Sequence, residues 1–297
     1  MNPAIYKQPL IMFLGAGASI PLGMKTTVEF YEWLKLREGI DFSLITSISN
    51  YIEASEEIGK KIDIEVILDH IEEIIEASKL LETAFRASLS RADIKVENYF
   101  PSGAPKPKDY INLREQIKNL VITHYSEIDE NKAFGLYRSL LEGFPPSTLP
   151  VFTTNYDLAI EKAFGHPKAR FRLIDGFERK KRTIPEWSGR SYQDYKPSGK
   201  GHDVMLFKLH GSVDWHLTPA GSIQRVETRE RDPGQMKTIL VYPSRQKREI
   251  HDEPFRTSYD YLFACLAHAK TCMIVGFSFR DQEIVEQLRA AIGINKD

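Results

Sequence analysis

Four short segments place glycine or polar side chains directly after an apolar run. They read GAGAS at 15–19, TTNYD at 153–157, KLHGS at 208–212 and GFS at 276–278. In open α/β sheets, ligands bind in the crevice outside the carboxyl ends of the strands. The position of the four segments therefore predicts that they lie at the ligand-binding edge of such a sheet.

The first segment suits a phosphate group. Gly15 and Gly17 let the backbone approach a pyrophosphate, and the N-terminus of a following helix offers N–H groups and the positive end of its dipole. Ile20 replaces the third glycine of the G-x-G-x-x-G fingerprint, which disfavours an ordinary dehydrogenase. Met24 separates Gly23 from Lys25 and breaks the phosphate-loop spacing of ATPases. A tight strand-to-helix turn that binds no ligand explains the two glycines equally well.

The second and third segments carry groups suited to acid–base chemistry. The amide of Asn155 can orient a water, and the carboxylate of Asp157 or the backbone beside it can hold a carboxamide. His210 is a candidate general base because its unperturbed pKa lies near neutrality, and its position at a strand end separates it from five of the other seven histidines. The neighbouring His202 and His216 remain unassigned. The alternatives are that Asn155 or Asp157 caps the next helix and that His210 is structural.

The fourth segment ends the last apolar run with a small residue and a hydroxyl. Gly276 and Ser278 suit the edge of a ribose or an adenine. The alternative is a helix start, with Ser278 or Asp281 as the capping residue.

The elements that must position these segments alternate between strands and helices. Such alternation predicts an α/β fold with a Rossmann-like, mostly parallel sheet. Residues 42–144 are charged with an apolar helical face, so they predict a helical insertion, which would supply a lid or an oligomer surface. Residues 178–203 predict a polar surface excursion. The predicted strands are 9–14, 149–153, 204–209, 239–242 and 272–275, and the predicted helices outside the insertion are 27–37, 157–164 and 254–268.

Composition excludes several classes of protein. Forty basic residues stand against 41 acidic ones, so no overall basic field attracts nucleic acid or anionic lipid, and we expect no sequence-specific binding of nucleic acid. The opening apolar run is too short to span a membrane, and no signal peptide is recognisable, so we expect a cytoplasmic protein. Cys265 and Cys272 alone cannot build a cysteine-ligated zinc site, and we expect both to be reduced core residues.

Taken in this order, the four motifs resemble those of Sir2-like proteins, and we treat residues 1–297 as a single Sir2-like domain with the 42–144 insertion inside it. The resemblance implies that NAD binds along the strand ends. Its pyrophosphate would contact Gly15, Ala16, Gly17 and Ser19. Asn155, with Thr154 beside it, would contact the nicotinamide ribose and a water, Asp157 would belong to the nicotinamide pocket, and His210 would be the general base near the ribose hydroxyls. Gly276 and Ser278 would lie beside the adenosine ribose, although Phe277 replaces the family's small threonine.

Two departures from the sirtuin pattern change the expected reaction. The chain lacks the four cysteines of the sirtuin zinc module, and the acyl-lysine cleft of deacylases depends on that module. The resemblance therefore implies an NAD hydrolase that uses NAD as substrate, needs no metal and releases nicotinamide and ADP-ribose. A non-catalytic NAD or ADP-ribose sensor is the alternative from another class. A deacylase or ADP-ribosyltransferase is a third.

Zinc-less Sir2-like proteins of this type act in bacterial anti-phage defence. The resemblance implies a homo-oligomer that depletes NAD upon infection together with a HerA-type ATPase, an Argonaute or another sensor. It leaves open whether the chain is part of a larger protein.

Overall fold

The chain forms two compact units, seen here in a computed structural model. The structure describes residues 1–54, 62–88, 105–142, 147–178, 183–199, 202–227, 237–241 and 251–295. Met1–Met24, Ile122–Val241 and Gln246–Asp297 make up the first unit, and Lys25–Val121 makes up most of the second. All four motifs therefore belong to the first unit.

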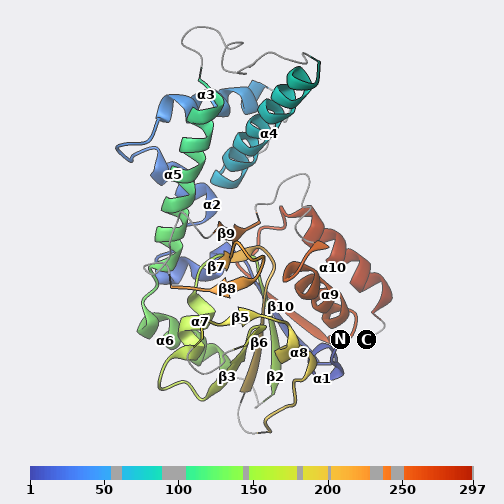
Figure 1. The fold of residues 1–297 in the computed structure, drawn as a ribbon. Coiled ribbons are helices and arrows are strands. Elements are labelled where there is room, and N and C mark those ends of the chain that lie inside the picture. The colour runs from blue at the N-terminus through green and yellow to red at the C-terminus, as the bar shows by residue number, and fades with distance from the viewer. Residues whose placement is uncertain are drawn as a thin grey trace. The chain divides into compact units, whose positions relative to one another are not determined.

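A five-stranded parallel sheet is the centre of the first unit (Figure 1). β1, β2 and β6 are buried almost throughout, which explains why their sequences read as continuous apolar runs rather than as alternating patterns. The parallel pairing confirms the predicted Rossmann-like arrangement. In spatial order the strands are β10 (Thr271–Val275), β1 (Leu10–Leu14), β2 (Thr148–Thr153), β6 (His202–Lys208) and β3 (Phe171–Ile174).

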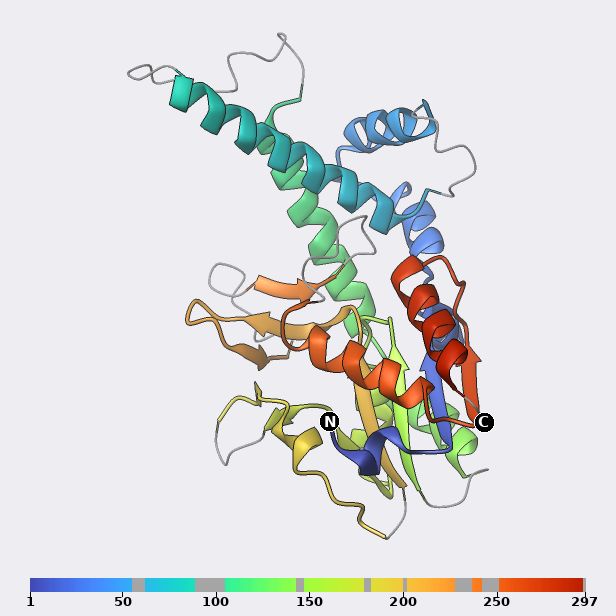
Figure 2. The ribbon, with the colours of Figure 1, turned by 90° about the vertical axis from the view of Figure 1, so that its right-hand side faces the viewer.

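Helices cover both faces of this sheet. α9 (Phe255–Leu266) packs on β2 and β6 and is joined by α1 (Pro3–Tyr6) and α10 (Gln282–Ile294). α7 (Ala159–Gly165) packs on β3, with α6 (Glu130–Leu141) against it, on the opposite face (Figures 1 and 2). α7 and α9 confirm the helices predicted near 157–164 and 254–268.

A second, antiparallel sheet follows the motif strands, and the sequence did not predict it. Its order is β4 (Phe177–Glu178), β5 (Glu186–Trp187), β8 (Ile223–Arg225), β7 (Gly211–Leu217) and β9 (Lys237–Leu240). The strand predicted at 239–242 was wrongly placed in the parallel sheet: its described part belongs to β9, which pairs antiparallel with β7. An apolar run of this length does not reveal which kind of sheet it joins.

The polar stretch at 178–203 is not only a surface excursion. It contributes β5 and α8 (Arg190–Gln193), and Tyr192 of α8 is 1% exposed. The Tyr192 ring stacks on Phe207, which also stacks on Phe152 and on Tyr261 of α9. This aromatic cluster joins α8, the parallel sheet and α9, so Tyr192 anchors α8 in the core.

The second unit is helical. It contains α2 (Thr27–Leu34), α3 (Phe42–Ala54), α4 (Ile64–Ser88) and most of α5 (Pro107–Ser126). A capping box between Thr26 and Glu29 starts α2. Arg114 and Lys118 of α5 both bind Glu72 of α4, at 3.0 Å and 2.8 Å. Within the described part of the chain, no helix combines the length and the apolar character needed to cross a membrane.

We predict that Gly176→Ala destabilises the packing of Trp187 in β5 against the turn that precedes β4. Gly176 has a φ of +83°, and an added Cβ would lie 1.8 Å from the Trp187 ring. Gly221 has the same φ and open space around it, so Gly221→Ala is the matched control. We expect about 1–2 kcal/mol of backbone strain in both variants and about 1–3 kcal/mol more in Gly176→Ala from overpacking. Urea unfolding measures both, and equal losses would contradict the prediction.

Candidate functional site

The carboxyl ends of four neighbouring strands are aligned. Leu14, the last residue of β1, pairs with Val275 of β10 on one side and with Thr153 of β2 on the other, and Thr153 pairs with Lys208 of β6. Adjacent strands lie about 4.8 Å apart. The four motifs therefore begin at the same level along one edge of the sheet, as their sequence positions predicted.

The glycines of the first and fourth motifs meet backbone to backbone. Gly15 N–H donates to the carbonyl of Val275, and Gly17 N–H donates to that of Gly276, both at 2.9 Å. A Cβ on Gly15 would lie 2.6 Å from the Gly276 oxygen, and Gly276 itself has a φ of +68°. This close approach requires glycine at these positions even when no ligand is bound, as the alternative of a tight turn proposed. The contact of this loop with a pyrophosphate stays a prediction.

The element that follows Gly15 differs from the expected one. Ala16 begins a 3₁₀ helix, η1 (Ala16–Leu22), in which Ser19 is buried. The predicted helix near 27–37 exists as α2, but it begins at Thr27 in the other unit. Gly23, in the left-handed conformation with φ +88°, ends the 3₁₀ helix and so separates the glycine loop from α2.

Asn155 connects the second motif to the first. Its Nδ2 donates to the carbonyl of Gly15 at 3.0 Å and to Ser19 Oγ at 3.1 Å. Its Oδ1 is buried and has no hydrogen-bond partner among the described residues. An amide oxygen accepts hydrogen bonds from water or hydroxyl groups. The side chain is thus held by its nitrogen and offers a fixed acceptor, which fits a sugar hydroxyl or a water.

The neighbours of Asn155 make backbone contacts. Thr154 N–H donates to the carbonyl of Leu14 at 3.2 Å. Asp157 is buried, and its Oδ1 accepts the N–H of Ala159 at the start of α7, at 2.9 Å. Asp157 does not cap α7, because the N-cap residue is Leu158 and this helix has no side-chain cap, so the contact braces the turn before the helix. The place of Asp157 in a nicotinamide pocket stays a prediction.

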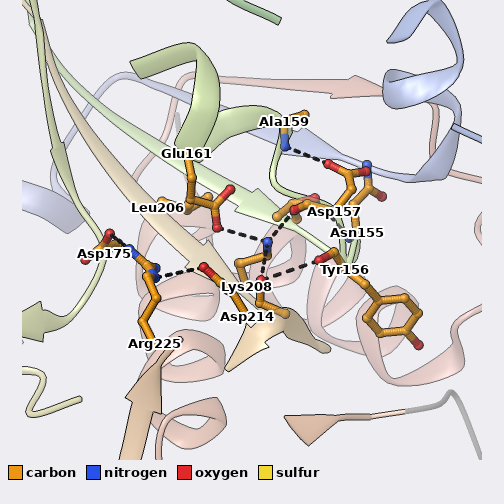
Figure 3. A network of polar contacts seen from close by, with 12 residues as sticks. Asn155, Tyr156, Asp157, Ala159, Glu161, Asp175, Leu206, Lys208, Asp214 and Arg225 are labelled. Atoms are coloured by element: carbon orange, nitrogen blue, oxygen red, sulfur yellow. Dashed lines mark hydrogen bonds and ion pairs between the residues drawn. The ribbon is translucent and has the colours of Figure 1, made fainter. Parts of the chain in front are cut away.

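A buried lysine joins the second and third motifs (Figure 3). Lys208 is 1% exposed, and its Nζ donates to the carbonyl of Asp157, to Glu161 Oε1 at 3.0 Å and to Ser212 Oγ at 2.9 Å. Burial raises the pKa of Glu161, and the positive charge of Lys208 opposes that rise. The sequence analysis missed this lysine, because its partners are not adjacent in the sequence.

The ion pairs continue into the second sheet. Arg225 of β8 binds Asp175 at 2.6 Å and Asp214 of β7 at 3.1 Å (Figure 3). These buried charges fix β7 and β8 next to the strand end that carries the third motif.

His210 lies in the turn from β6 to β7 and is buried. Its Nε2 is 2.8 Å from Oδ2 of Asp281, the residue that precedes α10. The ring of Tyr156 lies on another side, with its centroid 6.4 Å from the imidazole centroid. Sequence reasoning gave Asp281 a capping role only. Its position five residues after Gly276 is the signal that could have placed it at this edge of the sheet.

The fourth motif contains one exposed hydroxyl and one packed ring. Ser278 is exposed, and its Oγ accepts from Arg280 Nε at 3.3 Å, whereas Asp281 caps α10. The Phe277 ring packs on Phe13, with centroids 4.8 Å apart. Phe277 therefore closes the sheet edge with an aromatic ring where sirtuins have threonine.

The comparisons with known proteins agree with this placement. Residues 150–297 match the family model of the SIR2-like domain. The matched segment contains the second, third and fourth motifs. The match supports the Sir2-like family as the class of this protein and, in general terms, an NAD-related activity. No curated protein matches the chain. Among the described residues, no group of three or more His, Cys, Asp and Glu side chains is arranged to hold a metal ion.

We predict that Gly15→Ala lowers stability in the absence of any ligand. The added methyl must displace the Gly276 backbone, and such overpacking costs about 1–3 kcal/mol. Gly165→Ala at the end of α7 meets nothing within 4 Å and is the control, with no loss expected. Thermal unfolding without NAD measures both variants. Wild-type stability of Gly15→Ala would show that the loops can separate freely.

We further predict that Lys208→Met costs about 3–5 kcal/mol of stability, because it leaves Glu161 buried without its cation. The double variant Lys208→Met/Glu161→Leu should recover most of this loss. Arg138→Met breaks the exposed pair with Glu142 and should cost less than about 1 kcal/mol. Chemical denaturation compares the three variants with the wild type. A double variant that is no more stable than Lys208→Met would refute the buried-pair explanation.

Proposed function

We propose that this chain is an NAD hydrolase, which breaks the bond between nicotinamide and ribose and releases nicotinamide and ADP-ribose. The observation that supports this most directly is the pairing of two features on neighbouring strand ends. Asn155 carries a buried amide oxygen without a partner among the described residues, and His210 carries a facing carboxylate. Both lie within the segment that matches the SIR2-like domain.

The chemistry needs few protein groups. The ring nitrogen of nicotinamide already bears a positive charge in NAD, so it takes the bonding electron pair and departs as a neutral molecule without a general acid. The oxygen of a water molecule forms the new bond to the ribose carbon. His210 accepts the proton that this water loses and returns it to solvent.

Asn155 would act by position. Two hydrogen bonds from its Nδ2 fix the amide plane, so Oδ1 keeps its orientation before the substrate binds. Groups that are oriented in advance stabilise a transition state without the cost of reorganisation. A water or ribose hydroxyl that donates to Oδ1 would be held at the edge of the sheet where the motifs converge.

The biological setting is part of the same proposal. Because the chain lacks the cysteines of the sirtuin zinc module, we propose NAD depletion in the cytoplasm, as the effector of an anti-phage defence system, rather than deacylation. The protein would act as a homo-oligomer with a HerA-type ATPase, an Argonaute or another sensor as partner.

We predict that the purified chain, alone or with such a partner, converts NAD to nicotinamide and ADP-ribose, measured by chromatography. His210→Ala and Asn155→Ala should abolish release, because they remove the base and the fixed acceptor. Each variant also loses buried polar contacts, so we expect a lower melting temperature but a folded protein at the assay temperature, which circular dichroism checks. His268→Ala changes a histidine that follows α9, near the start of β10 and away from the motif edge, and should keep full activity.

Three other outcomes would replace the hydrolase proposal with a different one. NAD binding without release under every condition would favour a sensor. Release that depends on an acylated peptide would favour a deacylase. Unfolding of both alanine variants would support structural roles for Asn155 and His210.

A further inference from the structure

A buried carboxylate faces the candidate base from a different part of the chain. The side chains of His210 and Asp281 are 4% and 7% exposed, and Nε2 and Oδ2 are 2.8 Å apart. His210 belongs to the turn after β6, and Asp281 belongs to the start of α10. The fold therefore brings together two ionisable groups that are 71 residues apart in the sequence.

Asp281 is held in place by its own helix. Its Oδ1 accepts the N–H of Ile284 and caps α10, while Oδ2 faces the imidazole. Ile284 and Leu288 anchor this helix in the core, with exposures of 0% and 8%. The carboxylate of Asp281 thus both caps α10 and faces His210. The cap fixes the direction from which Oδ2 approaches the imidazole.

The backbone before Asp281 adopts a costly conformation. Phe279 has a φ of +58° and, in the described part of the chain, no other residue besides glycine has a positive φ. Such conformations persist where the surrounding structure imposes them, often at functional sites. The chain passes through this conformation between Gly276 and Asp281, two residues before the carboxylate that faces His210.

Asp281 lies at the N-terminus of α10, where the helix dipole stabilises a negative charge. A carboxylate in this position attracts a proton to the facing nitrogen of the imidazole and stabilises the imidazolium that forms when the base takes a second proton.

We propose that Asp281 is the positioning residue of His210: it keeps a proton on Nε2, so that Nδ1 is the basic nitrogen, and it stabilises the imidazolium during the reaction. This inference rests on the proposed hydrolase function. In the step concerned, water loses its proton to Nδ1, the water oxygen bonds to the ribose carbon, and nicotinamide departs with its electron pair. Asp281 remains ionised throughout.

The substitution Asp281→Asn separates the two tasks of this side chain. Asparagine caps helices as well as aspartate does, so α10 keeps its cap while the negative charge is lost. We expect kcat for NAD cleavage to fall on the order of 10²–10⁴-fold, with KM and the melting temperature near their wild-type values. Asp281→Ala loses the cap as well and should also melt at a lower temperature.

A matched control is available at another helix. Asp129 caps α6 by accepting the N–H of Lys132 at 2.8 Å, and it is exposed. Asp129→Asn makes the same chemical change at an N-cap away from the motifs and should leave kcat and KM unchanged. A wild-type kcat in Asp281→Asn would overturn the positioning role, as would an equal loss in both variants.

A second measurement does not depend on turnover. Nitrogen NMR shifts of the His210 ring, assigned with His210→Ala, report which nitrogen carries the proton. We expect the Nε2–H tautomer in the wild type and a mixture in Asp281→Asn. If the wild type fails to cleave NAD, the hydrolase proposal fails, yet this spectrum still decides the pairing. Identical tautomers in the two proteins would overturn it.

Discussion

The rest of the site depends on the close approach of two backbone turns, at Gly15 and Gly17 after β1 and at Gly276 after β10. Because no side chain separates these turns, hydrogen bonds between them run from N–H to carbonyl at 2.9 Å. The carbonyl of Gly15 then receives the amide of Asn155, and the chain beyond Gly276 leads through the strained Phe279 to Asp281. One contact between glycines therefore sets the positions of both the fixed amide and the carboxylate that faces His210.

The parts of the fold that could be predicted are those that leave a long signal in the sequence. Strands buried on both faces produce continuous apolar runs, and the parallel sheet and the edge at which its motifs lie followed from them. The antiparallel sheet left only part of such a signal: β4 and β5 are two residues long, and the apolar run at 239–242 was recognised as a strand but assigned to the parallel sheet. At the site, Asn155 and His210 could be found as strand-end residues. Lys208 and Asp281 could not, because their partners Glu161 and His210 are far away in the sequence and an aspartate before a helix reads first as a cap.

Lys208 and His210, two buried nitrogen bases at this edge, differ in what they can do. An ammonium group has three donors, and the three contacts of Lys208, to Asp157, Glu161 and Ser212, use all of them. Lys208 therefore joins β6, α7 and β7. An imidazole changes its charge near neutral pH, and His210 faces the carboxylate of Asp281 at 2.8 Å. The lysine is suited to holding the two motif loops together, and the histidine is suited to moving a proton.

The charge of the His210 and Asp281 pair suits the proposed reaction both before and after the proton transfer. Before proton transfer, a neutral imidazole and an ionised carboxylate carry one net negative charge in a buried place, where electrostatic effects are stronger than in water. Positive charge develops on the ribose carbon as the bond to nicotinamide lengthens, so this negative charge stabilises the transition state more than the ground state. Once the imidazole has taken the proton from water, the pair becomes a neutral ion pair, and its attraction for the product weakens. A carboxylate and a histidine held together by a helix cap can thus provide both the base and the electrostatic complement that a reaction without a general acid requires.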